Sequence, residues 1–168
     1  FHLAACTSLM GCDKVIRQES NIEITCVLID SLQSYPDIRL IYSSSAGAIG
    51  FNYGAGVMEE DHSFDAHHID YFLSKQKSEK LIIKETSRKL DAVILNVATI
   101  IGGRGMRGVQ CDVFRKIARG KMLFFPPGGS CFVYVMDVVD GMIAAWRKGC
   151  SGERYILGGY NMTFEEYF

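Results

Sequence analysis

Residues 91–101, DAVILNVATII, decide the fold class. The segment is almost continuously apolar and rich in β-branched side chains, which is typical of a strand that is buried on both faces. Such strands occur in parallel sheets that helices cover on both sides. We therefore predict an α/β protein in which this segment is a buried strand.

The rest of the chain alternates short apolar runs with longer amphipathic runs. Further strands are predicted at 1–4, 38–44, 131–135 and 154–157, and helices at 13–34, 68–90, 109–119 and 137–148. Strand followed by helix, repeated along the chain, is the order of a parallel sheet covered on both faces. A Thr-x-x-Glu capping box at Thr163 and Glu166 predicts that another helix begins there. Met142, Ile143, Ala145 and Trp146 are expected in the core.

The composition is typical of a soluble globular protein, with 48% hydrophobic and 22% charged residues among 168. The net charge of −1, without a long run of either sign, predicts no nucleic-acid partner and no membrane-surface stripe. No apolar stretch approaches the roughly 18 residues that a membrane span requires. The six cysteines show neither a CxxC pair nor metal-ligand spacing, so we expect free thiols, no metal and a cytoplasmic location.

Polar groups fall where the predicted strands end, which is where open α/β sheets bind ligands. The sequence SSSAG (43–47) closes one strand, and Asn96 and Thr99 lie late in the next. Tyr71 and Lys75 lie on the connecting helix, and their spacing of four residues directs both side chains into the same space. A solvated surface pair and a serine in a turn are the ordinary alternatives for these residues.

This combination of side chains suits proton transfer coupled to redox chemistry at a carbinol carbon. A free tyrosine has a pKa near ~10 and is a poor base at neutral pH, but a lysine ammonium a few ångströms away favours the phenolate. We therefore expect Lys75 to lower the pKa of Tyr71. A serine hydroxyl at the facing strand end could hold the substrate oxygen while the tyrosine takes or returns its proton, with hydride passing to a nicotinamide.

Several segments resemble, in order and spacing, the motifs of one protein family. They are FHLAA (1–5), NIEIT (21–25), YSSSAG (42–47), YFLSK (71–75), LNVATIIG (95–102), FVYVMDVVDGM (132–142) and GERYILGG (152–159). Together they resemble the extended short-chain dehydrogenase/reductases, the NAD-dependent epimerase/dehydratase group. In this resemblance, YFLSK would be the family's Tyr-x-x-x-Lys motif. The resemblance implies a partial Rossmann-like, doubly wound parallel sheet. Residues 1–168 would be the C-terminal portion of that single domain, truncated at both ends.

The resemblance also implies roles for individual residues. Ser45 would orient the substrate oxygen, Tyr71 would be the acid/base, and Lys75 would lower the tyrosine pKa and bind the nicotinamide ribose. The residues expected to bind the cofactor, NAD or NADP, are Leu3, Ala4, Ala5, Asn21, Tyr71, Lys75, Val97 and Thr99. The residues expected to meet the substrate are Ser45, Asn96, Arg104 and Arg107.

A glycine-rich segment, GGRGMRG (102–108), contains a literal G-x-G-x-x-G after a strand and before a helix. We do not interpret it as a phosphate-binding turn, because no Asp or Glu stands at a strand end about 20 residues later and Arg104 and Arg107 crowd the turn. The resemblance places a substrate loop here and the phosphate-binding turn upstream of FHLAA. The two arginines either meet a substrate phosphate or carboxylate or are simply solvated.

The combined prediction is an NAD(P)-dependent oxidoreductase or epimerase acting on a carbinol or ketone. The substrate would be a nucleotide sugar or a dihydroflavonol-like or steroid-like molecule. The alternative is a non-catalytic module of the same fold, either a relic or a cofactor-sensing regulator. The expected partners are a small-molecule substrate and, as one option, a second copy that packs through the Tyr71/Lys75 helix and its neighbour.

The first testable prediction concerns the 168-residue chain by itself. Without a phosphate-binding turn ahead of FHLAA, the cofactor pyrophosphate has no helix N-terminus to bind. We expect isothermal titration to give NAD(P) binding no tighter than millimolar, with no oxidoreductase activity and only marginal stability in a thermal melt. Micromolar binding with a cooperative melt would instead make GGRGMRG a working phosphate loop.

Overall fold

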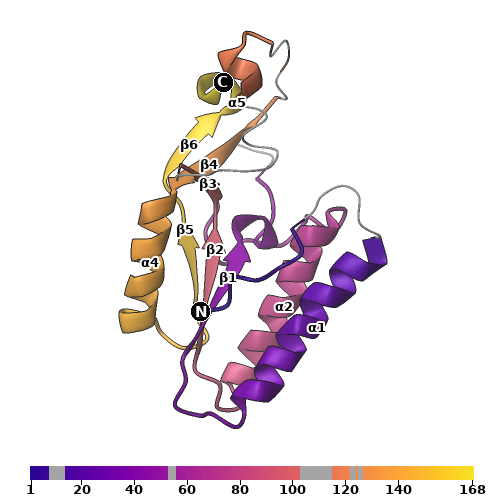
Figure 1. Ribbon diagram of the computed structural model, residues 1–168, viewed down its shortest axis with the longest axis vertical. Helices are drawn as coiled ribbons and strands as arrows, with labels where there is room; N and C mark the ends of the chain where they lie inside the picture. Colours follow the sequence, from indigo (N-terminus) through magenta and orange to yellow (C-terminus); the bar gives the residue numbers. More distant parts are fainter. Residues whose placement is uncertain (8–13, 53–55, 103–114, 122–123, 125–126) are drawn as a thin grey trace.

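The computed structural model describes residues 1–7, 14–52, 56–102, 115–121, 124 and 127–168. Its helices are α1 (Lys14–Leu32), α2 (Asp70–Thr86), α4 (Val135–Lys148) and α5 (Phe164–Tyr167), with a 3-10 turn, η1, at Ala46–Ala48. Its strands are β1 (Leu40–Ser45), β2 (Ala92–Val97), β3 (Thr99–Ile101), β4 (Gly129–Tyr134), β5 (Arg154–Leu157) and β6 (Tyr160–Thr163). The alternation of helices and strands confirms the predicted α/β class (Figure 1).

A parallel sheet with the strand order β1-β2-β5 forms the centre of the structure. β1 and β2 pair from Leu40 opposite Ala92 to Ser45 opposite Val97, and β5 pairs with the other side of β2. All six residues of β2 are buried. The central, doubly buried strand predicted from the sequence is therefore confirmed.

The amino-terminal segment lies along the free side of β1 but forms less strand than predicted over 1–4. It makes one parallel bridge, between His2 and Tyr42. The His2 amide donates to the carbonyl of Ile41 at 2.9 Å, and the Ser43 amide donates to the carbonyl of His2 at 3.0 Å. Two hydrogen bonds align this segment with β1 and bring its next residues to the end of that strand.

The two faces of the parallel sheet carry separate hydrophobic clusters. One contains Ile41, Val93, Leu95, Val97, Val133, Val138 and Ala145, and so joins the sheet to α4. The other contains Ile29, Leu40, Tyr42, Ala92, Ile94 and Ile82, and joins the sheet to α1 and α2. Because strand residues alternate between faces, helices cover both sides, as the doubly wound prediction requires (Figure 1).

The apolar run that continues to Ile101 is two strands instead of one. β2 ends at Val97, and β3 starts at Thr99 in a second sheet with the order β3-β4-β6. Ala98 stands between them, and its amide donates to the carbonyl of Leu157 at 3.0 Å. β3 pairs with β4 in parallel, whereas β4 pairs with β6 antiparallel. β6 was not predicted, since its short and mostly exposed sequence has no strong strand pattern.

The helix boundaries differ from the predicted ones at a few places. α2 ends at Thr86 instead of continuing to residue 90, and the chain then turns at Lys89, whose φ is 144°. The predicted helix 109–119 lies largely outside the described residues, of which 115–118 are helical. The predicted capping box is present: the Glu166 amide donates to Thr163 Oγ1 at 3.1 Å and the Thr163 amide donates to Glu166 Oε2 at 2.8 Å.

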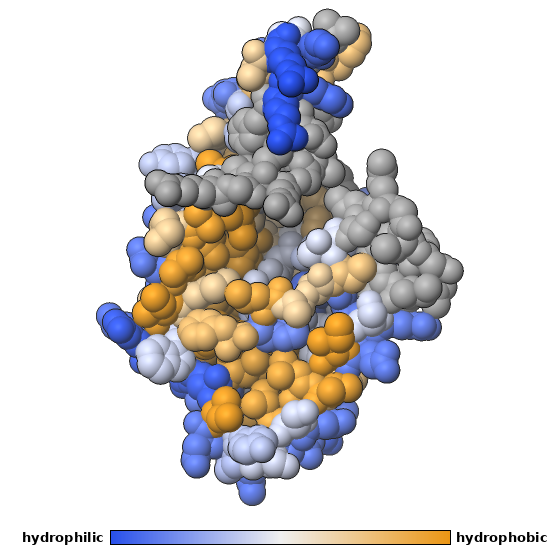
Figure 2. All heavy atoms as spheres, in the orientation of Figure 1, coloured by the Kyte–Doolittle hydropathy of each residue, from blue (hydrophilic) through white to orange (hydrophobic). Residues whose placement is uncertain are grey.

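The surface of α4 is more apolar than its position at the edge of the structure would suggest. Its exposed side chains include Met136, Val139, Ile143 and Trp146, and Trp146 is 50% exposed. The expectation that Ile143 and Trp146 lie in the core is therefore wrong, because Val138 and Ala145 form the buried stripe of this helix. Figure 2 shows hydrophobic residues gathered on the face where α4 flanks the sheet. Among the described helices, none is long and apolar enough to cross a membrane.

The packing of β2 generates a stability prediction. Leu95 has no exposed surface, whereas Val27 on α1 is 60% exposed. Leu95→Ala is expected to lower the free energy of unfolding by about 2–5 kcal/mol, because it removes buried atoms and leaves a cavity. Val27→Ala is the control and should change it by less than about 0.5 kcal/mol. Urea denaturation of the protein expressed from its complete reading frame, followed by circular dichroism, measures both, and equal effects would contradict the assignment of β2 as the core strand.

Candidate active site

A cavity of about 220 Å³ lies at the carboxyl ends of β1 and β2. Its walls come from the amino-terminal segment, the end of β1, the start of α2 and the junction of β2 with β3. The lining residues are Leu3, Ala5, Thr7, Ser43, Ser44, Ser45, Tyr71, Lys75, Val97, Ala98 and Ile100. The structure thus brings together Ser45 from one segment of the sequence and Tyr71 and Lys75 from another. We call this cavity the cleft.

Lys75 is held inside the cleft wall, where its side chain is almost fully buried. Its residue exposure is 2%, and its Nζ donates to the carbonyl of Ser43 at 2.8 Å. The ammonium also lies 4.7 Å from the centre of the Tyr42 ring, a distance that permits a cation–π interaction. Burial lowers the pKa of Lys75 from 10.5 to about 8, and the negative charge of Glu79 opposes that shift.

Tyr71 stands one turn before Lys75, at the start of α2, and is partly buried. Burial raises the pKa of its phenol, and the nearby Tyr42 adds to the increase. Lys75 is not among the causes of this shift, so its expected lowering of the Tyr71 pKa stays a prediction. Desolvation of the phenolate is the dominant cause, and the Lys75 ammonium is already engaged by the carbonyl of Ser43.

Ser45 is fixed by the turn that follows β1. Its Oγ accepts a hydrogen bond from the Gly47 amide at 3.2 Å and so caps η1. Gly47 packs so closely against the ring of Phe72 that an added Cβ would overlap the ring. A glycine is therefore required where the turn meets α2. The neighbouring Ser44 has a different partner, since its hydroxyl donates to the carboxylate of Glu79.

The helices behind the cleft are joined by buried hydrogen bonds between polar side chains. Asn21 Nδ2 donates to Ser74 Oγ at 3.0 Å, and Thr25 Oγ1 donates to Ser78 Oγ at 3.1 Å. Asn21 also pairs with the backbone of Cys6, whose amide donates to its Oδ1 at 2.8 Å. Asn21 therefore fixes the amino-terminal segment against α1 from behind the cleft wall.

The other predicted site residues are distributed more widely than the sequence indicated. Leu3, Ala5 and Val97 line the cleft, whereas Ala4 is exposed outside its lining. Asn96 is fully buried beneath the cleft. Thr99 lies beyond it, with Oγ1 3.0 Å from Ser130 Oγ. Arg104, Arg107 and the rest of GGRGMRG after Gly102 lie outside the described residues.

Glu79 is a buried group that the sequence prediction did not include. Its exposure is 1%, although it is a carboxylic acid, and Asn96 Nδ2 donates to its Oε1 at 2.7 Å. Arg154 Nη1 lies 3.5 Å from its Oε2. The signal in the sequence was the spacing Tyr71, Lys75, Glu79, which places all three residues on one face of α2.

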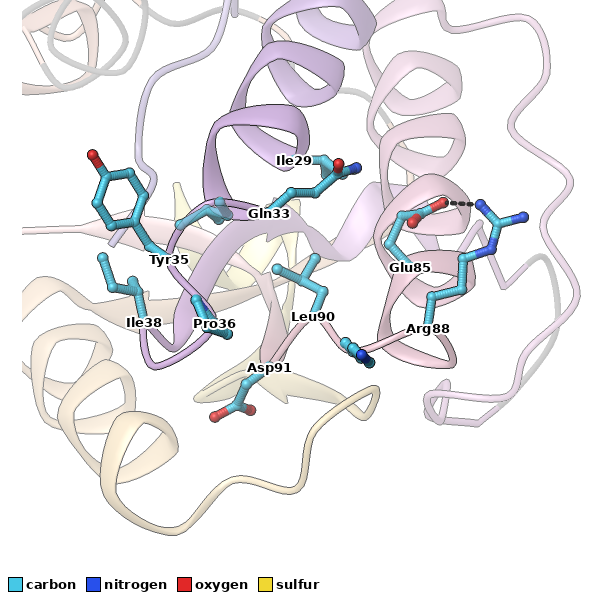
Figure 3. A pocket seen from close by; sticks show the side chains of 11 residues that line it. Ile29, Gln33, Tyr35, Pro36, Ile38, Glu85, Arg88, Leu90 and Asp91 are labelled. Atoms are coloured by element: carbon cyan, nitrogen blue, oxygen red, sulfur yellow. Dashed lines mark hydrogen bonds and ion pairs between the residues drawn. The ribbon is translucent and has the colours of Figure 1, made fainter.

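A second cavity, of about 350 Å³, lies at the opposite ends of the strands. Figure 3 shows its lining, which comes from the end of α1, the loop before β1 and the segment between α2 and β2. Glu85 and Arg88 form an ion pair at its edge, with 3.1 Å between Oε1 and Nη1. The smaller cleft is the better candidate site, because parallel sheets bind ligands at the carboxyl ends of their strands.

A parallel sheet with helices on both faces and a cleft at its carboxyl ends is the arrangement of Rossmann-like α/β proteins. A sequence model of the NAD dependent epimerase/dehydratase family matches residues 1–158, and the chain belongs to this family. The predicted family is therefore confirmed. The expected cofactor, NAD or NADP, agrees with the dependence on NAD that defines the family.

Two curated relatives match almost the whole chain. Sterol demethylase protein B of Methylococcus capsulatus is 32% identical over 97% of this chain and 50% of its own length. A putative dihydroflavonol 4-reductase of Synechocystis is 27% identical over 98% of this chain and 50% of its own length. The chain thus spans about half the length of the curated relatives it matches.

Two solved structures illustrate the agreement in fold. The protein gox2253 superimposes with a TM-score of 0.90 at 28% identity, over 99% of this chain and 52% of its own. The dTDP-glucose 4,6-dehydratase DesIV of Streptomyces venezuelae, a double mutant solved with NAD bound, superimposes with a TM-score of 0.85 at 20% identity, over 99% of this chain and 53% of its own. Both comparisons support the Rossmann-like arrangement.

The described residues of the cleft fit one end of a nicotinamide dinucleotide. Lys75 supplies a buried ammonium, and Ser43, Ser44 and Ser45 supply hydroxyl or carbonyl groups beside it. Such donors and acceptors match the hydroxyl groups of a ribose. The apolar lining formed by Leu3, Ala5, Val97, Ala98 and Ile100 suits a planar ring.

The burial of Lys75 generates a prediction about stability and pH. Its folded-state pKa of about 8 lies below the ordinary value of 10.5, so the fold disfavours the charged form. This penalty is fully present below pH 8 and disappears as the pH rises to 10.5. Lys75→Met is therefore expected to stabilise the protein near neutral pH, by about 1–2 kcal/mol after the lost hydrogen bond is included.

Urea denaturation near neutral pH and again near pH 10.5, the ordinary lysine pKa, tests this expectation. The gain should shrink at the higher pH. Lys80→Met, at an exposed position of the same helix, is the control and should show little change at either pH. A Lys75→Met variant that is less stable than the parent near neutral pH would contradict the burial argument.

Proposed function

We propose that this chain carries the acid/base centre of an NAD(P)-dependent oxidoreductase that acts on a carbinol or ketone. The observation that carries the proposal is the meeting of Ser45, Tyr71 and Lys75 in one cleft at the carboxyl ends of a parallel sheet. Membership of the NAD dependent epimerase/dehydratase family supports the same reaction class. The whole protein's activity belongs to this proposal, since the chain spans about half of its curated relatives.

Each of the three side chains has a distinct task in this proposal. The Ser45 hydroxyl donates to the substrate oxygen and holds it beside Tyr71. The Tyr71 hydroxyl gives a proton to that oxygen during reduction and takes it back during oxidation. When bound, the nicotinamide accepts or delivers a hydride at the substrate carbon. Lys75 donates to the cofactor ribose, and its positive charge favours the Tyr71 phenolate as the proton leaves.

The raised pKa of Tyr71 favours the direction of reduction. Burial keeps the phenol protonated at neutral pH, so Tyr71 is ready to act as an acid toward a ketone oxygen. In oxidation, the same residue would have to be deprotonated first, which burial opposes. We therefore propose that Tyr71 acts as the acid when a ketone is reduced, with carbinol oxidation as the reverse.

A polycyclic, largely apolar substrate is favoured over a nucleotide sugar. The two curated relatives are described as a sterol demethylase protein and a putative dihydroflavonol reductase, at 32% and 27% identity. Leu3, Ala98 and Ile100 give the cleft apolar walls that would contact such a ring system. The DesIV structure, at 20% identity, supports the fold alone. The alternative of a non-catalytic module is not favoured, because none of the three reactive side chains is missing from the cleft.

We also propose a second copy of the chain as a partner and the cytoplasm as the location. Ile24 and Val27 on α1 and Ile83 on α2 are exposed, which supports a second copy as a partner at these helices. The described cysteines, Cys6, Cys26, Cys131 and Cys150, are free. Free thiols support the cytoplasm as the location, since its redox balance keeps cysteines reduced.

Tyr71→Phe tests the proposed function in the protein expressed from its complete reading frame. We expect kcat to fall by about 10²- to 10⁴-fold, because only the proton-transferring hydroxyl is lost. Affinity for NADPH or NADH should stay within about threefold of the parent, since the lysine remains. A steroid ketone and a dihydroflavonol are the ketone probes, whose reduction is followed by the loss of NAD(P)H absorbance. dTDP-glucose is the third probe and is followed by analysis of the sugar product, because the hydride it gives up is returned to it and the nicotinamide absorbance does not change. Tyr35→Phe, at an exposed tyrosine, is the control.

Two outcomes would contradict the assignment. Turnover by Tyr71→Phe at the parental rate would exclude Tyr71 as the acid. Binding of the cofactor without turnover of any probe by the parent would favour the non-catalytic module.

A further inference from the structure

Glu79 is a carboxylate that the proposed reaction does not use, and it is buried directly behind the cleft. It lies four residues after Lys75 and eight after Tyr71, on the same face of α2. Only 1% of its surface is exposed. Burying a carboxylate costs several kcal/mol unless it is well partnered, so its partners indicate what the position is for.

The partners of Glu79 come from all three strands of the parallel sheet. Its Oε1 accepts hydrogen bonds from Ser44 Oγ of β1 and from Asn96 Nδ2 of β2, the latter at 2.7 Å. Its Oε2 lies 3.5 Å from Arg154 Nη1 of β5. A single side chain therefore ties α2, which carries Tyr71 and Lys75, to every strand beneath it.

Asn96 extends this connection to the serine of the cleft. Its Nδ2 has two hydrogens, and besides Glu79 Oε1 it donates to the carbonyl of Ser45 at 3.0 Å. The amide thus bridges the Glu79 carboxylate and the Ser45 backbone. The position of Ser45 relative to Tyr71 is consequently set by two hydrogen bonds that run through Glu79 and Asn96, in addition to the turn that Gly47 closes.

The charge of Glu79 acts on Lys75 within the same interior. Burial disfavours the ammonium form of Lys75, and Glu79 is the group whose charge opposes that effect. The other cation near the carboxylate is Arg154 from β5, which also donates to the carbonyl of Glu60. Tyr42 on β1 is neutral at physiological pH, because burial raises the pKa of its phenol. Burial raises the pKa of the Glu79 carboxyl, whereas its hydrogen bonds from Ser44 and Asn96 and the charge of Arg154 act in the opposite direction. Among the described groups, Glu79 is the one whose charge raises the pKa of Lys75.

We propose that Glu79 is a positioning residue of the cleft, which holds Ser45 in place through Asn96 and supplies a negative charge beside Lys75. The inference rests on the proposed function, since it assigns a task to a residue that touches neither substrate nor cofactor. The two parts of this task are separable, because position depends on the length of the side chain and charge depends on its ionisation.

Two substitutions separate these parts. Glu79→Gln keeps the length and a carbonyl oxygen for Ser44 and Asn96 but removes the charge. It should shift the alkaline limit of kcat/KM to lower pH by about 0.5 to 1 unit, because Lys75 then loses its proton more easily. Glu79→Asp keeps the charge but withdraws it from Asn96. The Glu79→Asp variant should keep the parental alkaline limit of kcat/KM. Its kcat should fall by about tenfold, because Ser45 is no longer held in place beside Tyr71.

Asn96→Leu and Glu85→Gln complete the experiment in the complete protein. Asn96→Leu breaks the bridge to Ser45 with little change in volume, so it should reproduce the kcat loss of Glu79→Asp without a pH shift. It also tests the positioning step if a Glu79 variant fails to fold. Glu85→Gln removes a carboxylate from the same helix, far from the cleft at the edge of the other cavity, and should leave both readouts unchanged.

The proposal is overturned if the Glu79 variants and Asn96→Leu lower the melting temperature but keep the parental kcat and alkaline limit, since Glu79 would then be structural only. Failure of the proposed function looks different. If the proposed function is wrong, the Tyr71→Phe variant keeps the parental turnover. That result rejects Tyr71 as the acid/base whatever the Glu79 variants show.

Discussion

The burial of β2 between two helical layers is the constraint on which the rest of the structure depends. A strand has a period of two, so once Val93 and Leu95 face α4, Ile94 and Asn96 must face α1 and α2. Three of these positions carry aliphatic side chains, and the last carries an amide. The same alternation that fills the core with apolar groups therefore delivers a polar group to the interior, at the end of the strand where the cleft begins.

The space between α2 and the sheet becomes more polar toward the carboxyl ends of the strands. Ile82 packs among aliphatic residues near the start of β2, whereas Glu79 and Lys75 lie nearer its end. A wholly apolar interface would be at least as stable, because buried charges repay their desolvation only with good geometry. Hydrogen bonds have directional requirements that apolar contacts lack, so these polar groups fix one alignment of helix on sheet.

The sequence was informative where the decisive pattern is local, and uninformative where distant segments meet. Periodicity predicted β2, and a spacing of four residues predicted that Tyr71 and Lys75 share a face. The direction of the Tyr71 pKa shift depends on how deeply other segments bury it, which no spacing reveals. Glu79 was missed because its hydrogen-bond partners lie 35 and 17 residues away. The break at Ala98 was missed because β2 and β3 are equally apolar.

Within the described residues, the chain crosses between its two sheets three times: at Ala98, through α4 between β4 and β5, and at the pair Gly158 and Gly159 that separates β5 from β6. The parallel sheet carries Ser45 and packs against the helix with Tyr71 and Lys75, whereas the second sheet contributes Ile100 to the cleft. A substitution at Ile100 therefore alters the shape of the cavity while the reactive side chains keep their supports. Such a division allows the preference for one ligand over another to diverge during evolution at little cost to the chemistry.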